Sequence, residues 1–467
     1  MVQKILFVSI FMEGKGGGEG RVAYEMARWF SKYRQVVMLC PGKSTGLQVD
    51  NDGFKRYTLQ STGEGELAVP LLSPLNIRRL FSFLSEFKPN IVHIHDPAML
   101  GVVAQLWAIA NHVPVFYTAH IIPNRALDFG TSEVAHFLTG PITEGLVEKY
   151  LLNFYQNCDA VVGLNEITSR EIRDFGYTGP ILHIPNGRNL RQFHTCQFAD
   201  PLASEKALTF VGFISKRKNQ EFLIQAMKFL PTNYRLMLIG EPIVNAYQEE
   251  LAQKAADLQV NVTFTGQLNQ QEISTILEKT HVFVSASKME VQSLSVIEAL
   301  ASGTPVVGLS NETIDELVDT SNGIRLSKEI SPQEFASAVH RICELDESEY
   351  RKLCESARSR VNTLDWSNVM EKTMQSYTEI SKLKANVPVS KTPTEVLHKY
   401  ITQLPVGKLQ EILLEALSKV PVPSREKTSV NARALWITWL NMTASVVGYY
   451  LLTGPLLLIR KRRKGKD

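Results

Sequence analysis

Residues 282–305 of this 467-residue chain read VFVSASKMEVQSLSVIEALASGTP. The run Val282–Ala286 is short, apolar and rich in β-branched residues, which is typical of a strand buried on both faces. A loop with Glu290 follows, and then a helical pattern of apolar residues that contains Glu298. The stretch therefore predicts one strand–loop–helix unit of a parallel sheet covered by helices.

The same alternation of apolar runs and helical patterns recurs along most of the chain, which predicts an α/β protein with parallel sheets. We expect two successive sets of six strands. The first set is Ile5–Phe11, Val36–Cys40, Ile91–His95, Val115–His120, Ala160–Leu164 and Ile181–Pro185. The second set is Leu208–Phe213, Arg235–Gly240, Val262–Gly266, Val282–Ala286, Val306–Leu309 and Gly323–Leu326. Each half therefore predicts a doubly wound, Rossmann-like domain.

Composition and charge limit the classes of protein that the chain can belong to. Hydrophobic residues make up 44% and charged residues 21%, which is ordinary for globular domains and excludes wholesale disorder or a collagen-like repeat. The net charge is +3, but the basic tail Arg460–Asp467 contributes +5 and leaves the rest at −2. We therefore expect no nucleic-acid partner.

Five cysteines occur without any C-x-x-C pair. Zinc or redox motifs would need such spacing, so we expect buried, reduced thiols in a cytosolic compartment.

The carboxyl end predicts membrane attachment. Residues 434–459 contain no charged residue, would extend about 39 Å as a helix, and are followed by the basic tail. That length exceeds the bilayer core of roughly 30 Å. A buried C-terminal helix is the alternative, and whether the segment spans the bilayer or lies at its interface stays open. We expect the catalytic body on the cytoplasmic side.

A glycine run, Gly14–Gly20, separates the first strand from a helical pattern. Such a loop lets backbone N–H groups approach a phosphate at a helix N-terminus, although simple turn glycines would give the same pattern. No Walker lysine follows, and the second strand ends in Cys40-Pro41-Gly42 without an acid for a ribose. Nucleotide hydrolysis and dinucleotide chemistry are therefore disfavoured.

The stretch from Glu290 to Pro305 closely resembles the E-x7-E signature of retaining glycosyltransferases of the GT-B type, family four. The acid spacing, the run EALASGTPVV and the strand–loop–helix setting all agree with that family. Further similar motifs follow in order along about 380 residues. They are Gly16–Gly20, Ile91–His95, Phe116–His120, Ile184–Gly187 and Val211–Asn219.

The resemblance implies a GT-B fold, in which two Rossmann-like domains face a cleft. It divides the chain into an acceptor domain (1–187), a nucleotide-sugar domain (188–365) and a return helix (366–385). A linker with a helical extension (386–432, its helix over about 394–420) and the apolar membrane segment with the basic tail (433–467) would follow.

Residue roles in donor binding also follow from the resemblance. Glu298 would bind the ribose, Glu290 the hydroxyls of the donor sugar, and Lys218 the diphosphate. The family's arginine is replaced by Phe213, so Lys216 or Arg217 is expected to substitute for it. The remaining donor-binding residues would be Gly17, Gly18, Asn186, Gly187 and the backbone N–H groups of Ser293 and Leu294.

His120 resembles the family's histidine at the reaction centre, and with Glu290 and Lys218 it completes the expected catalytic set. We expect His93 and His95 to face opposite sides of their strand, and we assign no metal and no cofactor. The resemblance implies transfer with retention of anomeric configuration, with catalysis by positioning and stabilisation of the leaving diphosphate.

The form Glu290-Val-Gln-Ser-Leu is similar to the variant found in diacylglycerol glucosyltransferases. It points to a lipid acceptor and favours UDP-glucose as donor, with other UDP-hexoses and GDP-mannose left open. Alternatives are a polyprenyl-linked or polysaccharide acceptor, a catalytically degenerate nucleotide-sugar sensor on the membrane, and a Rossmann oxidoreductase.

Overall fold

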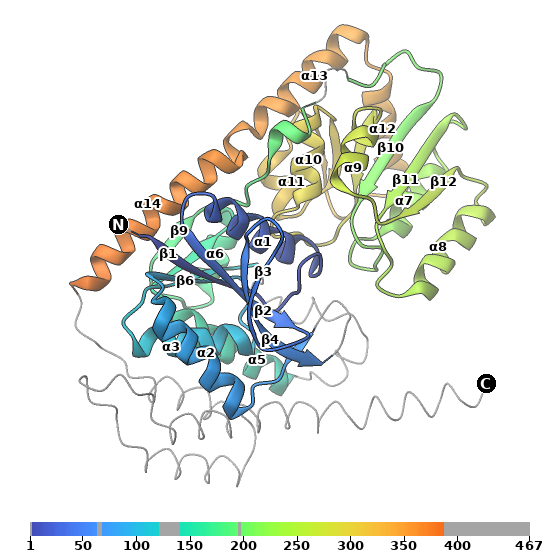
Figure 1. The fold of residues 1–467 in the computed structure, drawn as a ribbon. Coiled ribbons are helices and arrows are strands. Elements are labelled where there is room, and N and C mark those ends of the chain that lie inside the picture. Colours follow the sequence, from blue (N-terminus) through green and yellow to red (C-terminus); the bar gives the residue numbers. More distant parts are fainter. Residues whose placement is uncertain (1, 63–67, 121–140, 195–197, 387–467) are drawn as a thin grey trace, which may run out of the picture. The chain divides into compact units, whose positions relative to one another are not determined.

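The computed structural model describes residues 2–62, 68–120, 141–194 and 198–386, which form two compact α/β units (Figure 1). Unit 1 comprises Met1–Val162, Glu171–Leu182 and the chain from Met374 onward. Unit 2 comprises Gly163–Arg170 and His183–Thr373. The expected domain boundary between residues 187 and 188 lies within unit 2. Helix α14, Trp366–Ala385, begins in unit 2 and ends in unit 1.

Unit 2 contains a six-stranded parallel sheet, so the second predicted set of strands is confirmed. Its strands are β10 (Lys206–Val211), β11 (Tyr234–Ile239), β12 (Val262–Gly266), β13 (Val282–Ser285), β14 (Val306–Leu309) and β15 (Gly323–Leu326). The spatial order is β12-β11-β10-β13-β14-β15, so the strand order reverses between β10 and β13. In such sheets ligands bind outside the carboxyl ends of the strands at this switch point.

Helices cover both faces of the unit 2 sheet. They are α7 (Gln220–Met227), α8 (Asn245–Asp257), α9 (Gln270–Leu277), α10 (Leu294–Ser302), α11 (Glu312–Leu317), α12 (Pro332–Cys343) and α13 (Glu347–Arg360), followed by α14. Side chains alternate along β13: Val282 and Val284 pack with α7 and α12, whereas Phe283 packs with α9 and α10. Burial on both faces explains why these strands read as continuous apolar runs.

Unit 1 contains a nine-stranded sheet, so the prediction of six strands in the first half is wrong. The strands are β1 (Lys4–Val8), β2 (Gln35–Gly42), β3 (Gly46–Val49), β4 (Lys55–Thr62), β5 (Val69–Pro70), β6 (Ile91–Ile94), β7 (Val115–Thr118), β8 (Ala160–Gly163) and β9 (Ile181–His183). The missed strands β3, β4 and β5 join one side of the sheet, where β3 and β5 each pair antiparallel with β4. Because β3 alternates between half-buried and exposed residues, it gives no apolar run in the sequence.

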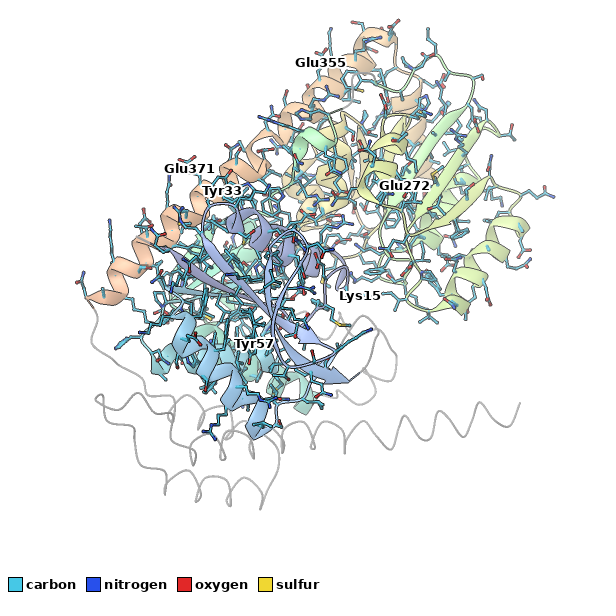
Figure 2. All side chains as sticks on the ribbon, in the orientation of Figure 1. Lys15, Tyr33, Tyr57, Glu272, Glu355 and Glu371 are labelled. Carbon is cyan, nitrogen blue, oxygen red and sulfur yellow. The ribbon has the colours of Figure 1, made fainter. Side chains whose placement is uncertain are left out.

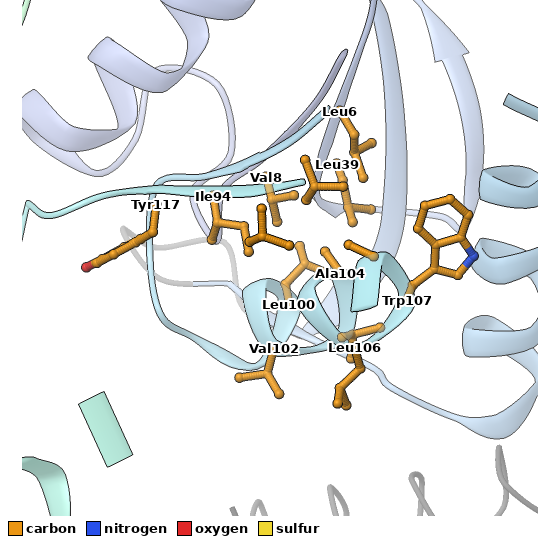
Figure 3. Packing of buried hydrophobic residues seen from close by; sticks show 14 of the residues in the cluster. Leu6, Val8, Leu39, Ile94, Leu100, Val102, Ala104, Leu106, Trp107 and Tyr117 are labelled. Carbon is orange, nitrogen blue, oxygen red and sulfur yellow. The ribbon is translucent and has the colours of Figure 1, made fainter. Parts of the chain in front are cut away.

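The helices of unit 1 pack on both faces of this sheet. They are α1 (Gly17–Ser31), α2 (Pro74–Phe87), α3 (Met99–Ala110), α5 (Pro141–Gln156), the end of α6 (Glu166–Asp174), which begins in unit 2, and the end of α14. On one face Leu100 and Trp107 of α3 pack with Leu6 and Leu39 of the strands (Figure 3). On the other face Phe7 stacks on Phe30 of α1, with ring centroids 5.9 Å apart.

Four of the five cysteines, at positions 40, 158, 343 and 354, are buried free thiols, as expected. Within the described ranges, which end at residue 386, no helix is long and apolar enough to cross a membrane. The predicted segment 434–459 and the predicted helix over 394–420 both lie outside the described residues. Membrane attachment therefore stays a prediction.

Candidate active site

The loops that follow β10 and β13 bring Lys218 and Glu290 together at the switch point of the unit 2 sheet. The Lys218 ammonium donates a hydrogen bond to the Glu290 carboxylate, and each side chain is only 11% exposed. Burial lowers the pKa of Lys218, which the Glu290 charge partly opposes. Burial alone would raise the pKa of Glu290, but the charges of Lys218 and Arg217 lower it, so the carboxylate is ionised at neutral pH.

Arg217 is the second cation beside Glu290. Its guanidinium donates to the carbonyl oxygen of Met289 at 3.2 Å, and its charge contributes to the lowered pKa of Glu290. Lys216 is exposed. Arg217, one of the two basic residues considered as a substitute at the Phe213 position, is therefore held against the loop that contains Met289.

The loop from Ser287 to Ser293, which we call the donor loop, leads into α10. Helix α10 begins at Leu294, and the side chain of its N-cap residue Ser293 makes no capping bond to the first turn. The Ser293 N–H donates to Thr313 Oγ1 at 2.8 Å. Of the two predicted diphosphate donors, Ser293 therefore already has a protein acceptor.

Glu298 lies one turn into α10, where its carboxylate pairs with the guanidinium of Arg188. Both side chains are 2% exposed, and the Arg188 guanidinium lies 5.7 Å from the centre of the Phe193 ring. Isolated buried charges are costly, so each of the two groups depends on the other. The predicted ribose ligand is thus held in a buried ion pair that the sequence analysis did not foresee.

Asn186 and Gly187, both predicted to bind the donor, take part in internal packing. The Asn186 N–H donates to Gln292 Oε1 at 2.6 Å. A Cβ at position 187 would lie 2.3 Å from the Trp366 ring, so close packing requires glycine there. Packing against Trp366 therefore explains why residue 187 is a glycine, whether or not it binds a donor.

Gln292 itself is buried and bonded internally. Besides accepting from Asn186, its amide donates to the Leu164 carbonyl at 3.3 Å and to the Glu316 carboxylate at 3.4 Å. Gln292, one residue of the form Glu290-Val-Gln-Ser-Leu that pointed to a lipid acceptor, therefore ties the donor loop to neighbouring segments. A role in acceptor choice does not follow from these contacts.

In unit 1 the predicted residues Gly17 and Gly18 begin α1, directly after the loop that contains Lys15 (Figure 2). Gly16, the N-cap, and Gly17 have positive φ angles of 78° and 55°, a conformation that favours glycine. Next to them, Glu19 has a raised pKa because of its burial and the nearby charge of Asp96.

His120 forms a buried row with two other histidines of unit 1. His95 Nδ1 lies 3.2 Å from His120 Nε2, and the rings of His93 and His95 stack with centroids 4.7 Å apart. The prediction that His93 and His95 face opposite sides is wrong, because residues two apart along a strand point to the same face. Burial lowers the pKa of His93 and His120 to about 3, so both rings are neutral at physiological pH.

His93 also connects α14 to this row. Its Nδ1 bonds the hydroxyl of Tyr377, and its Nε2 lies 2.7 Å from Thr118 Oγ1. Tyr377 packs edge-on against Phe116, with ring centroids 4.7 Å apart. Within the described part of the chain, no group of three or more His, Cys, Asp or Glu residues is arranged to hold a metal ion.

Sequence reasoning missed Arg188, Glu312 and Thr313, all of which contact predicted site residues in unit 2. Arg188 directly follows Asn186 and Gly187, which were predicted to bind the donor. A charged residue next to such a motif is a signal that could have marked Arg188 as part of the site. The sequence contains no such signal for Glu312 and Thr313, because their contacts form only when the sheet places the loops after β13 and β14 side by side.

Two family models match consecutive parts of the chain. Glycosyltransferase Family 4 matches residues 16–192, and Glycosyl transferases group 1 matches residues 198–360. The fold resembles solved structures over more than four fifths of the chain. These include sucrose-phosphate synthase from Thermosynechococcus elongatus (TM-score 0.67, 20% identity, 82% of this chain and 100% of that chain). Another is Anabaena HepE in complex with UDP and glucose (TM-score 0.64, 17% identity, 81% and 100%).

The chain therefore belongs to the group 1 glycosyltransferases of family four, which have the GT-B fold. The resemblance found from its motifs is confirmed. A GDP-mannose-dependent alpha-mannosyltransferase of Corynebacterium glutamicum is 24% identical over 336 residues, which cover 69% of this chain and 76% of that protein. Alpha-monoglucosyldiacylglycerol synthases of Streptococcus pneumoniae and Acholeplasma laidlawii are each 25% identical. The matches cover 50% and 54% of this chain, and 54% and 67% of those proteins.

Proposed function

We propose that this chain is a retaining, metal-independent glycosyltransferase that moves a hexose from a UDP-sugar, UDP-glucose being favoured, to a membrane lipid such as diacylglycerol. The observation that carries the donor side is the buried Lys218–Glu290 pair at the switch point of the unit 2 sheet. The acceptor side rests on the similarity to the two alpha-monoglucosyldiacylglycerol synthases.

The proposed chemistry assigns a separate task to each charged group. Lys218 and Arg217 stabilise the negative charge that develops on the departing diphosphate, together with the N–H groups of the first turn of α10. Glu290, ionised because of these cations, accepts hydrogen bonds from the hydroxyls of the sugar. The two cations and the helix terminus supply the electrostatic stabilisation that a divalent metal gives elsewhere.

Retention of configuration follows if the acceptor hydroxyl attacks on the face that the diphosphate leaves. The diphosphate oxygen then accepts the proton of the hydroxyl while the bond between the sugar and the diphosphate breaks. A neutral His120 suits a hydrogen bond to the transferred sugar, because an imidazole with one N–H adds no charge there.

The experiment that tests this proposal incubates the full-length protein with diacylglycerol in mixed micelles and a panel of nucleotide sugars, with and without EDTA. Mass spectrometry of the organic extract identifies any glycolipid, and NMR of the product gives the anomeric configuration. A hexosyl-diacylglycerol formed equally in EDTA supports the proposal. An inverted product, or activity that EDTA abolishes, contradicts the mechanism.

A GDP-mannose donor is the second candidate, because the Corynebacterium glutamicum relative is named as GDP-mannose-dependent and matches 69% of this chain. The donor panel separates the two candidates, since only one nucleotide sugar should be consumed at a high rate. Membrane attachment through residues 434–459 is tested by sedimentation with liposomes. If a chain that ends near residue 420 still sediments, the segment is not the anchor.

A further inference from the structure

The first turn of α11 contacts the donor loop through three consecutive side chains. Asn311 donates to the Ser287 carbonyl at 3.0 Å, the Glu312 carboxylate accepts from the Glu290 N–H at 3.2 Å, and Thr313 Oγ1 accepts from the Ser293 N–H. The three contacts span the donor loop from its first residue to its last. Because β13 and β14 are parallel neighbours, the loops at their carboxyl ends lie at the same edge of the sheet.

Glu290 is thereby held at both ends. Its carboxylate bonds Lys218, and its backbone N–H bonds Glu312. A carboxylate that accepts from an N–H makes a charge-assisted bond, and its position in the first turn of α11 is favourable for a negative charge. The direction in which the Glu290 side chain leaves the backbone therefore depends on Glu312.

We propose that Glu312 is a positioning residue for the donor sugar: it fixes the backbone of Glu290 so that the Glu290 carboxylate faces the sugar hydroxyls. The proposal rests on the proposed function of Glu290. Thr313 holds the other end of the donor loop in the same way. Glu312 is 4% exposed and Thr313 0%, so these bonds belong to the folded core.

The same geometry changes the expected role of the donor-loop N–H groups. The Glu290 and Ser293 N–H groups are satisfied by α11 and hold the loop in place. The diphosphate is then left to Lys218, Arg217 and the start of α10 at Leu294, where the Ser293 side chain makes no capping bond. Loss of Glu312 should therefore weaken the recognition of the sugar and leave that of the nucleotide.

Amide hydrogen exchange of the full-length protein tests the contact without any ligand. In Glu312→Ala the peptide that covers residues 288–294 should exchange at least about tenfold faster than in the wild type, since a bond to a charged acceptor is lost. Asp315→Asn is the matched control, because Asp315 is a carboxylate on the same helix that bonds Ser310 instead. Unchanged exchange in Glu312→Ala would overturn the proposal.

Binding of UDP and UDP-glucose, measured by calorimetry, tests the consequence for the sugar. In Glu312→Ala the Kd of UDP-glucose should rise about five- to tenfold while that of UDP changes less than twofold, and Glu312→Gln should recover most of the loss because its amide oxygen still accepts. Equal weakening of both ligands would show a merely structural role and refute the proposal.

If the wild-type protein binds neither UDP nor UDP-glucose, the proposed function is refuted. Amide hydrogen exchange of Glu312→Ala and the wild type still tests the contact between Glu312 and the Glu290 N–H. If Glu312→Ala does not fold, Thr313→Val removes the other acceptor at nearly constant volume. Faster exchange at residues 288–294 and selective loss of UDP-glucose binding are then expected, and their absence counts against the proposal.

Discussion

Replacing Glu298 by alanine is expected to destabilise unit 2 by about 3–5 kcal/mol, whatever its effect on catalysis. The carboxylate pairs with Arg188, and both side chains are 2% exposed. The substitution therefore leaves a buried guanidinium without its carboxylate partner, and water cannot replace that partner at such low exposure. For a unit of about 200 residues, this loss corresponds to a decrease in Tm of about 10 °C.

The double variant Arg188→Met with Glu298→Leu removes both charges of the ion pair. Comparing it with Glu298→Ala separates the loss of stability caused by removing only the carboxylate from the loss caused by removing the whole pair. Because both charges are removed and apolar volume is kept, the double variant should cost less than Glu298→Ala alone. Urea unfolding, monitored by hydrogen exchange of unit 2 peptides, gives the free energies of unfolding of the wild type, Glu298→Ala and the double variant. A cost below about 1 kcal/mol for Glu298→Ala, or a double variant that costs as much as Glu298→Ala, would refute the reasoning.

Three further predictions concern single groups. Lys218→Met should lower kcat by about 10²–10³ because the leaving diphosphate loses its cation, while the exposed Lys228→Met should leave kcat within twofold; equal effects on kcat would contradict the assignment. Tyr377→Phe should destabilise unit 1 by about 1–3 kcal/mol, since Nδ1 of buried His93 loses its partner, and faster amide exchange in β6 would report it. Burial lowers the pKa of His93 from 6.5 to about 3, so below pH 6.5 the unfolded chain binds a proton that the folded chain does not, and unit 1 should lose stability as the pH falls towards 3. Burial also lowers the pKa values of His95 and His120, which add to this loss, whereas the raised pKa values of Asp96 and Glu19 oppose it. Three histidines outweigh two carboxyl groups, so unit 1 should be less stable at pH 5.5 than at pH 7.5. Denaturant unfolding at the two pH values measures this difference, and equal stabilities would contradict the prediction.

The sequence predicted the sheet of unit 2 strand by strand but not that of unit 1. All six unit 2 strands are parallel, and most are apolar enough to stand out as runs of β-branched residues. Strands β3 and β4 lie at one side of the unit 1 sheet, and β4 reads KRYTLQST, which alternates with polar residues and gives no such run. A search for apolar runs therefore finds strands with buried apolar residues and misses strands such as β3 and β4, in which polar residues interrupt the run.

The candidate site was predictable where its signal is local. Glu290 and Glu298 lie on one strand–loop–helix unit, and the pairing of Glu290 with Lys218 follows from two loops at one switch point. The contacts of Arg188 and Thr313 were not predictable, because each depends on the side chain that another segment places opposite it. A single sequence does not show which side chains from distant segments contact each other.

The bonds that hold the donor loop also make its residues structural, which affects how any loss of activity should be interpreted. Asn165 donates to the Val291 carbonyl at 2.8 Å, Gln292 bonds both Asn186 and Leu164, and Thr313 bonds Ser293. Removing any of these groups shifts the loop as well as deleting a side chain, so a lower rate alone assigns no catalytic role. The ratio of sugar-nucleotide affinity to nucleotide affinity does discriminate. A general loss of packing weakens both ligands, whereas a displaced Glu290 carboxylate weakens only the ligand that carries the sugar.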